Sequence, residues 1–255
     1  MKIVMALTGL AICGFITVHA IGNFQYWLGP DTYNTYAALL QGLGELLWLV
    51  RAGLLVCIIL HIISAVYLRL YSNEAKPTNY HVKNYVKATI NKRTMLWAGV
   101  LIACGVTFHI LHFTAGALNF ENGYNQQELT PTATYGAVAT STVVNIDGDE
   151  QINIYDSPDA NENYKIRHDV YGMVTTEFAN PVAVFVYIVF VFCVAFHLSH
   201  AIQSGLHTLG IQGRRFTPFI RIASIAIAFL IFCSLCILPV GVYAKSLLGC
   251  CIGGM

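Results

Sequence analysis

Six histidines lie within long apolar segments of this sequence: His19, His61, His109, His112, His197 and His200. Ionisable side chains are costly inside a membrane, so those found there tend to mark functional sites. Neutral imidazole is also a good iron ligand, and facing helices of a bundle can present two such rings to one haem. These histidines are therefore candidates for haem ligation, for binding another metal, or for proton transfer.

Five apolar segments that carry these histidines or follow them are long enough to cross a bilayer, which takes about 20 helical residues. The chain has 255 residues, of which 56% are hydrophobic and only 11% charged, whereas a soluble domain carries roughly 25% charged residues. The sequence predicts an all-α membrane protein, with one five-helix bundle over residues 1–255. The predicted spans are residues 3–24, 45–71, 95–119, 181–208 and 218–244.

Charged residues indicate the orientation of the spans, because Lys and Arg gather in cytoplasmic loops. The loop after the second span carries five basic residues between 76 and 93, and the loop after the fourth carries Arg214 and Arg215. We therefore expect both loops and the N-terminus in the cytoplasm. The C-terminus and the acidic loop 120–180 are then external. A net charge of +1 gives no indication of nucleic-acid binding.

The depths of four histidines predict two layers within the bilayer. With a rise of about 1.5 Å per residue, His19 lies roughly 24 Å and His109 roughly 21 Å from the inner boundary. His61 lies roughly 15 Å and His197 roughly 16 Å from the same boundary. An outer pair and an inner pair suit two stacked bis-histidine haems. The sequence lacks the C-x-x-C-H attachment motif, so these haems would be b-type.

The histidines suggest two alternatives to haem ligation. The H-x-x-H spacing of His109/His112 and His197/His200 is also typical of membrane di-iron desaturases. Those enzymes gather a larger histidine cluster at one membrane face, whereas these pairs lie mid-span at different depths. A transporter with a histidine proton relay is disfavoured, because the central parts of the spans contain no acidic residue. The alternative that stays open is a histidine-ligated di-iron oxidase or desaturase-like enzyme.

Four segments, in their order and spacing, resemble the single-chain, five-helix, two-haem cytochrome b subunit of bacterial succinate dehydrogenases and fumarate reductases. They are ITVHAIGNFQYWLGP, CIILHIISAVYLRL, GVTFHILHFTAG and FVFCVAFHLSHAIQSGLHTLG. The resemblance implies that His19 and His109 ligate the iron of the outer haem b, and that His61 and His197 ligate the iron of the inner haem b. Depth alone does not choose between His109 and His112, which differ by only about 4.5 Å along the helix axis.

The resemblance also implies partners and a reaction. A flavoprotein subunit with FAD and the dicarboxylate active site, and a subunit with iron–sulfur clusters, would dock on the cytoplasmic face of the bacterial inner membrane. The basic loops 76–93 and 210–221 are the expected docking surfaces. Electrons would pass between succinate and membrane quinone, with menaquinone as the expected species, in a complex that can form a higher oligomer.

Two further positions bear on the quinone reaction. Glu45, at the outer start of the second span, is the candidate for quinone protonation. An equally weighted interpretation is a carboxylate that interacts with Arg51 and with the helix dipole. Ala195 occupies a position where some fumarate-reducing relatives carry a glutamate for a proton path, which favours succinate oxidation.

Overall fold

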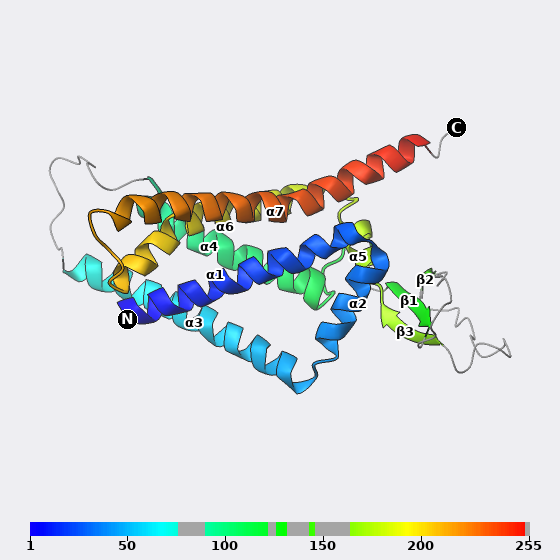
Figure 1. The fold of residues 1–255 in the computed structure, drawn as a ribbon, viewed down its shortest axis with the longest axis horizontal. Coiled ribbons are helices and arrows are strands. Elements are labelled where there is room, and N and C mark those ends of the chain that lie inside the picture. Colours follow the sequence, from blue (N-terminus) through cyan, green and yellow to red (C-terminus); the bar gives the residue numbers. More distant parts are fainter. Residues whose placement is uncertain (76–89, 122–125, 132–142, 146–163, 253–255) are drawn as a thin grey trace. The chain divides into compact units, whose positions relative to one another are not determined.

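Long apolar runs between polar boundary residues give this chain its helices. The computed structural model describes residues 1–75, 90–121, 126–131, 143–145 and 164–252. In chain order the helices and strands are α1 (Lys2–Phe24), α2 (Pro30–Gln41), α3 (Glu45–Glu74), α4 (Ile90–His109), β1 (Gln126–Pro131), β2 (Val143–Asn145), β3 (Tyr164–His168), α5 (Val170–Glu177), α6 (Pro181–Thr208) and α7 (Phe216–Ile252) (Figure 1). A 3₁₀ turn, Gln25–Leu28, follows α1, and a π-helical turn, Ile110–Thr114, follows α4.

Five of these helical stretches are long and apolar enough to cross a membrane, which confirms the predicted fold class. They are Lys2–Leu28, Glu45–Glu74, Arg93–Thr114, Pro181–Thr208 and Phe216–Gly249. Large apolar side chains such as Trp97, Phe185 and Phe219 are exposed on these helices. So much exposed apolar surface is unfavourable in water and favourable against lipid.

The start of the fourth span agrees with its prediction, whereas the end of the third does not. The Asn180 side chain accepts a hydrogen bond from the Val182 backbone N–H at 2.8 Å, capping α6 ahead of Pro181. The third span ends at Thr114 rather than at residue 119. Gly116 has a φ of 62°, which takes the backbone out of the helix soon after the π-helical turn.

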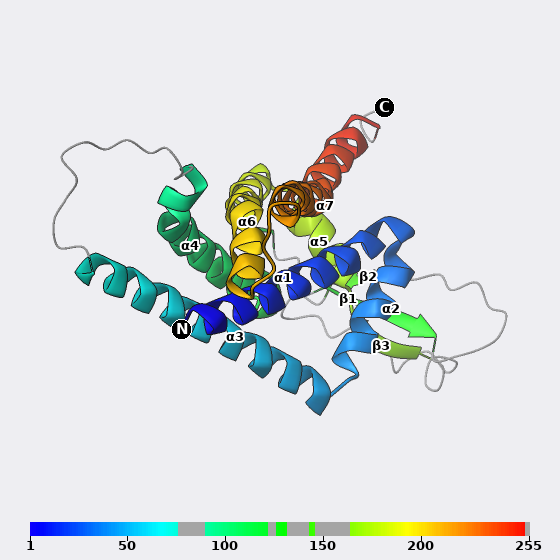
Figure 2. The ribbon, with the colours of Figure 1, turned by 60° about the vertical axis from the view of Figure 1, so that its left-hand side comes forward.

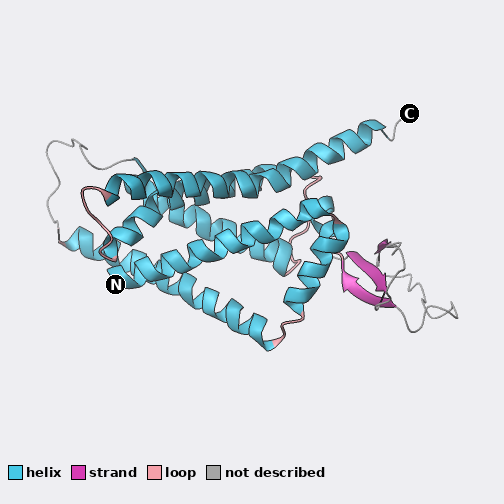
Figure 3. Ribbon diagram, viewed as in Figure 1, coloured by secondary structure: helices cyan, strands magenta, loops and turns pink. Residues whose placement is uncertain are grey.

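Two short helices and a small sheet lie in the connections between the spans (Figure 3). Helix α2 occupies most of the connection between the first two spans, with Pro30 in its first turn and Asp31 beside it. Strand β1 pairs antiparallel with β2 on one side and with β3 on the other. Among the described residues, this sheet is the one departure from an all-helical chain.

The described chain forms two compact units, and each draws on several spans. The first comprises Met1–Gly22, Gly44–Thr107 and Tyr187–Ile237, and the second comprises Asn23–Leu43, Phe108–Val186 and Leu238–Met255. In the first unit, α6 and α7 run side by side (Figures 1 and 2). Leu198 and Ile202 of α6 pack there against Ala228 and Ile231 of α7.

A buried polar contact anchors α5 in the second unit. Asn34 of α2 donates a hydrogen bond from Nδ2 to Asp169 Oδ1 at 2.7 Å, and its own side-chain oxygen accepts from the Tyr171 N–H at 2.8 Å. Asp169 also caps α5 by accepting from the Gly172 N–H. The neighbouring Tyr33 donates to Asn23 Oδ1, and burial raises the pKa of Tyr33 to about 12.

Candidate functional site

The structure brings together His61 and His197, the two residues predicted for the inner haem. His61 extends from α3 and His197 from α6, and both belong to the first unit. Their ring centroids are 6.5 Å apart with an interplanar angle of 70°. Two imidazoles from different helices, more than a hundred residues apart in sequence, therefore meet in an edge-to-face contact.

Residues of α1 orient the His61 ring. Its Nδ1 lies 3.2 Å from the Met5 carbonyl oxygen and 3.2 Å from Thr8 Oγ1. Thr8 Oγ1 lies 2.7 Å from the Val4 carbonyl oxygen, to which it donates. This arrangement favours the tautomer that carries its proton on Nδ1. The lone pair is then on Nε2, as in histidines that bind a metal through one nitrogen and donate from the other.

Two further observations concern the surroundings of these two rings. The Nδ1 atom of His197 is buried and has no hydrogen-bond partner in the described part of the chain. Buried polar atoms are seldom left without a partner, so this ring is a candidate for contact with a group from outside the chain. Gly9 packs directly on the other ring, because a Cβ atom at this position would lie 3.0 Å from His61 Cε1.

The two residues predicted for the outer haem lie in different units. The His19 ring stacks on Phe15 within α1, at a centroid distance of 5.7 Å, in the first unit. His109 is the last residue of α4 and belongs to the second unit, where its ring lies 5.9 Å from that of Phe113. The outer pair therefore stays a prediction.

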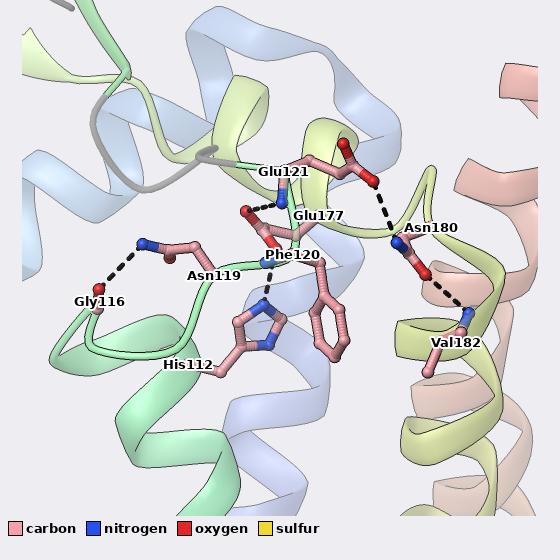
Figure 4. Close-up of polar contacts among 8 residues, drawn as sticks. All are labelled: His112, Gly116, Asn119, Phe120, Glu121, Glu177, Asn180 and Val182. Atoms are coloured by element: carbon pink, nitrogen blue, oxygen red, sulfur yellow. Dashed lines mark hydrogen bonds and ion pairs between the residues drawn. The ribbon is translucent and has the colours of Figure 1, made fainter.

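His112, the neighbour of His109 in sequence, forms a buried contact with Glu177. The His112 Nε2 and Glu177 Oε2 atoms are 2.9 Å apart, and each residue is only 1% exposed (Figure 4). The carboxylate also accepts hydrogen bonds from the backbone N–H groups of Phe120 at 2.8 Å and Glu121 at 3.3 Å. The Phe120 ring covers the imidazole edge-on at a centroid distance of 5.4 Å. Glu177 thus ties the last turn of the third span to the segment that follows it.

This contact assigns different roles to the two histidines of the FHILHF segment. The Nε2 atom of His112 is bonded to a carboxylate, so a metal would have to displace Glu177 to bind that atom. His112 lies within the π-helical turn Ile110–Thr114, which follows α4. A π-helical turn contains one residue more than an α-helical turn. The side chains of His109 and His112 therefore do not have the relative direction that a continuous α-helix would give them. The contact therefore gives His112 a structural partner, whereas the role of His109 as an iron ligand stays a prediction.

Glu177 is a functional candidate that sequence reasoning missed. Its signal in the sequence was weak: one carboxylate at the end of an acidic loop, four residues before Pro181. Its partners are an imidazole and two backbone N–H groups at separations of 56 to 65 residues, which no local pattern specifies.

Glu45 and Arg51 do not form the ion pair that was one of the two interpretations of Glu45. The Arg51 guanidinium lies over the Trp48 ring, 5.0 Å from its centroid, as expected for a cation–π contact. Glu45 is exposed in the first turn of α3, directly after Gly44, whose φ is 51°. The favourable position at a helix N-terminus is retained, whereas pairing with Arg51 is not found in the described part of the chain.

The described residues contain no group of three or more His, Cys, Asp or Glu side chains close enough to hold a metal ion. A di-iron centre requires such a cluster, so the desaturase-like alternative receives no support from this part of the chain. A bis-histidine haem requires only two facing imidazoles.

No protein-family model, curated protein or solved structure matches this chain.

Proposed function

We propose that this chain is the di-haem cytochrome b membrane anchor of a succinate:menaquinone oxidoreductase. In this role it binds two haem b groups and carries electrons between an iron–sulfur subunit and membrane quinone. The observation that supports the proposal most strongly is the pair of facing imidazoles of His61 and His197 between α3 and α6.

The residues of this pair fit a bis-histidine haem. The ring centroids of His61 and His197 are 6.5 Å apart, so both rings could contact one bound haem. The Met5 carbonyl and Thr8 hydroxyl beside His61 Nδ1 supply the outer-shell hydrogen bond that metal-bound histidines usually make. Because Gly9 has no side chain, the His61 ring can lie directly against α1 at this position.

When bound, the haems would supply one-electron transfer across the membrane. The protein's own contribution is the orientation of their ligands. His61 is held by α1 while it extends from α3, so the inner site is built from three helices of one unit. For the outer haem we propose His19 and His109, and the engagement of His112 Nε2 by Glu177 supports the choice of His109.

We assign the quinone-protonating role to Glu45. Its carboxylate is exposed at the start of α3 and is not ion-paired with Arg51 in the described chain, so a quinone in the membrane can reach it. A carboxylate can deliver or accept the proton that quinone reduction or quinol oxidation requires.

The proposed location is the bacterial inner membrane, with the N-terminus in the cytoplasm. The basic residues of the 76–93 and 210–221 loops support this orientation by the positive-inside rule. The same loops are the proposed docking surfaces for the flavoprotein, which holds FAD and the dicarboxylate site, and for the iron–sulfur subunit. In this proposal the dicarboxylate active site lies on the flavoprotein, so the enzymatic activity belongs to the complex as a whole.

The test is reduction of b-type haem by succinate in membranes that contain the chain with its partner subunits. We expect succinate to produce part of the α-band that dithionite produces, and a His61→Leu variant to lose the inner haem's share of it. Haem that dithionite reduces but succinate never does would contradict the assignment to a succinate oxidoreductase. Absence of b-type haem would contradict the cytochrome itself.

A further inference from the structure

A polar groove lies where the start of α1, the end of α6 and the start of α7 meet in the first unit. Its volume is about 780 Å³, and its polar lining includes Lys2, Gln203, Ser204, His207 and Thr217. These residues are at the end of the spans at which the chain's basic loops are located. The groove is separate from the His61–His197 pair, since neither of these residues lines it.

A second hollow of about 470 Å³ continues the first, because Gln203 and Thr217 line both. It adds Arg221 and an apolar wall that contains Ile222 and Ile225. Both isoleucines are largely exposed on the outer face of α7, in a stretch long and apolar enough to cross a membrane. The combined groove therefore has a polar, basic part and an apolar part that faces lipid.

The chemistry of the polar part is that of an anion site. The residues that line the two hollows include the cations Lys2 and Arg221 and no carboxylate. Helix α7 begins at Phe216, so the first-turn N–H groups and the positive end of its dipole lie beside Thr217. The His207 Nε2 atom is buried and lacks a hydrogen-bond partner within the described residues. Buried polar atoms are normally hydrogen-bonded, so a ligand in the groove could supply the partner of this ring nitrogen.

We propose that this groove binds one anionic phospholipid. Its phosphate lies between Lys2 and Arg221, with His207 and Thr217 as neutral hydrogen-bond partners, and an acyl chain follows Ile222 and Ile225. Basic pockets between membrane helices on the cytoplasmic side are suited to anionic lipid headgroups. The apolar wall selects a lipid over a soluble phosphate, which would leave that wall uncovered. This inference does not depend on the proposed electron-transfer function.

The experiment is native mass spectrometry of the full chain in detergent, with added phosphatidylglycerol or phosphatidylcholine. We expect one phosphatidylglycerol to be retained in preference to phosphatidylcholine. Lys2→Gln and Arg221→Gln should each weaken its binding about fivefold, and the double variant should weaken it more than tenfold. Arg221→Lys should retain most of the affinity. Arg214→Gln is the matched control: it removes one exposed positive charge from the same loop outside the groove lining, and should leave binding unchanged.

Four outcomes would overturn the proposal. Equal retention of the two lipids would show that the headgroup charge is not recognised. Wild-type affinity in the double variant would show that Lys2 and Arg221 do not hold the phosphate. Binding of inorganic phosphate as tight as that of phosphatidylglycerol would identify a soluble anion as the ligand. Loss of haem from the double variant, with lipid retention unchanged, would show that the groove holds a haem propionate instead.

Discussion

The His112 Nε2 atom lies 2.9 Å from the Glu177 Oε2 atom, in a buried contact between the turn that ends the third span and the end of α5. This contact distinguishes the two histidines at the end of the third span, which are three residues apart. His112 holds the turn in place, and His109 is left as the candidate iron ligand.

Separate replacement of these two histidines by leucine should give opposite results. We expect His109→Leu to remove one haem per chain, because the proposed assignment makes His109 a ligand of the outer haem. His112→Leu should keep both haems while lowering stability, because Glu177 then loses its buried partner. Haem content per chain, measured as the pyridine haemochrome, distinguishes the two variants. Loss of a haem from His112→Leu alone would transfer the ligand role to His112.

Glu177 should contribute strongly to stability. Glu177→Ala removes the acceptor for the imidazole and for the Phe120 N–H, which are both buried or partly buried. We expect the free energy of unfolding to fall by about 2–4 kcal/mol. Glu177→Gln keeps an acceptor oxygen and should cost about half as much.

The free energy of unfolding of the Glu177 variants is measured by reversible denaturation in detergent, with circular dichroism as the signal. Glu121→Gln is the matched control, since Glu121 is exposed and, within the described residues, its side chain accepts one hydrogen bond, from the half-buried Asn180 amide. This control should change the free energy of unfolding by less than about 0.5 kcal/mol. A similar small change for Glu177→Ala would mean that the buried contact does not stabilise the turn.

The size of residue 9 should control occupancy of the inner site. A Cβ atom at Gly9 would lie 3.0 Å from His61 Cε1, so alanine must displace the ring slightly and valine must displace it further. We expect Gly9→Ala to lose part of the inner haem and Gly9→Val to lose more of it. Gly249→Ala is the matched control, because a Cβ atom there meets nothing within 4 Å. Full haem content in Gly9→Val would show that the position of the His61 ring is not critical.

The spans, and the level at which His61 and His197 lie along them, could be predicted because apolar run length and helical rise are local properties. Apolar run length gave the five spans, and Asn180 with Pro181 gave the start of α6, whose capping contact lies within two residues. Depth counted along straight helices placed His61 and His197 at about the same level, and the structure brings their rings together.

The remaining features depend on contacts that are distant in sequence. The third span ends early beside the His112–Glu177 contact, which joins residues 65 positions apart. Helix α5 is capped by Asp169, which is itself bound by Asn34, 135 positions away. Hydropathy and spacing carry no information about such partners, so the π-helical turn, α2 and α5 were not predicted.

Glu45→Gln should abolish most quinone-coupled turnover and leave both haems in place. The amide cannot exchange the proton that quinone reduction requires, while the side chain keeps its size. The measurement is succinate-dependent quinone reduction in membranes, with haem content determined on the same sample. Glu74→Gln, at the opposite end of α3, is the matched control and should retain activity. Unchanged turnover in Glu45→Gln would show that Glu45 does not protonate the quinone and serves only as a carboxylate at the N-terminus of α3.

The central claim is tested most directly by the number of haem b groups per purified chain. The pyridine haemochrome, divided by the amount of protein, should give two for the natural chain and one for His61→Leu, because the proposed assignment makes His61 a ligand of the inner haem alone. A value of one or none for the natural chain, or an unchanged value of two in His61→Leu, would contradict the account.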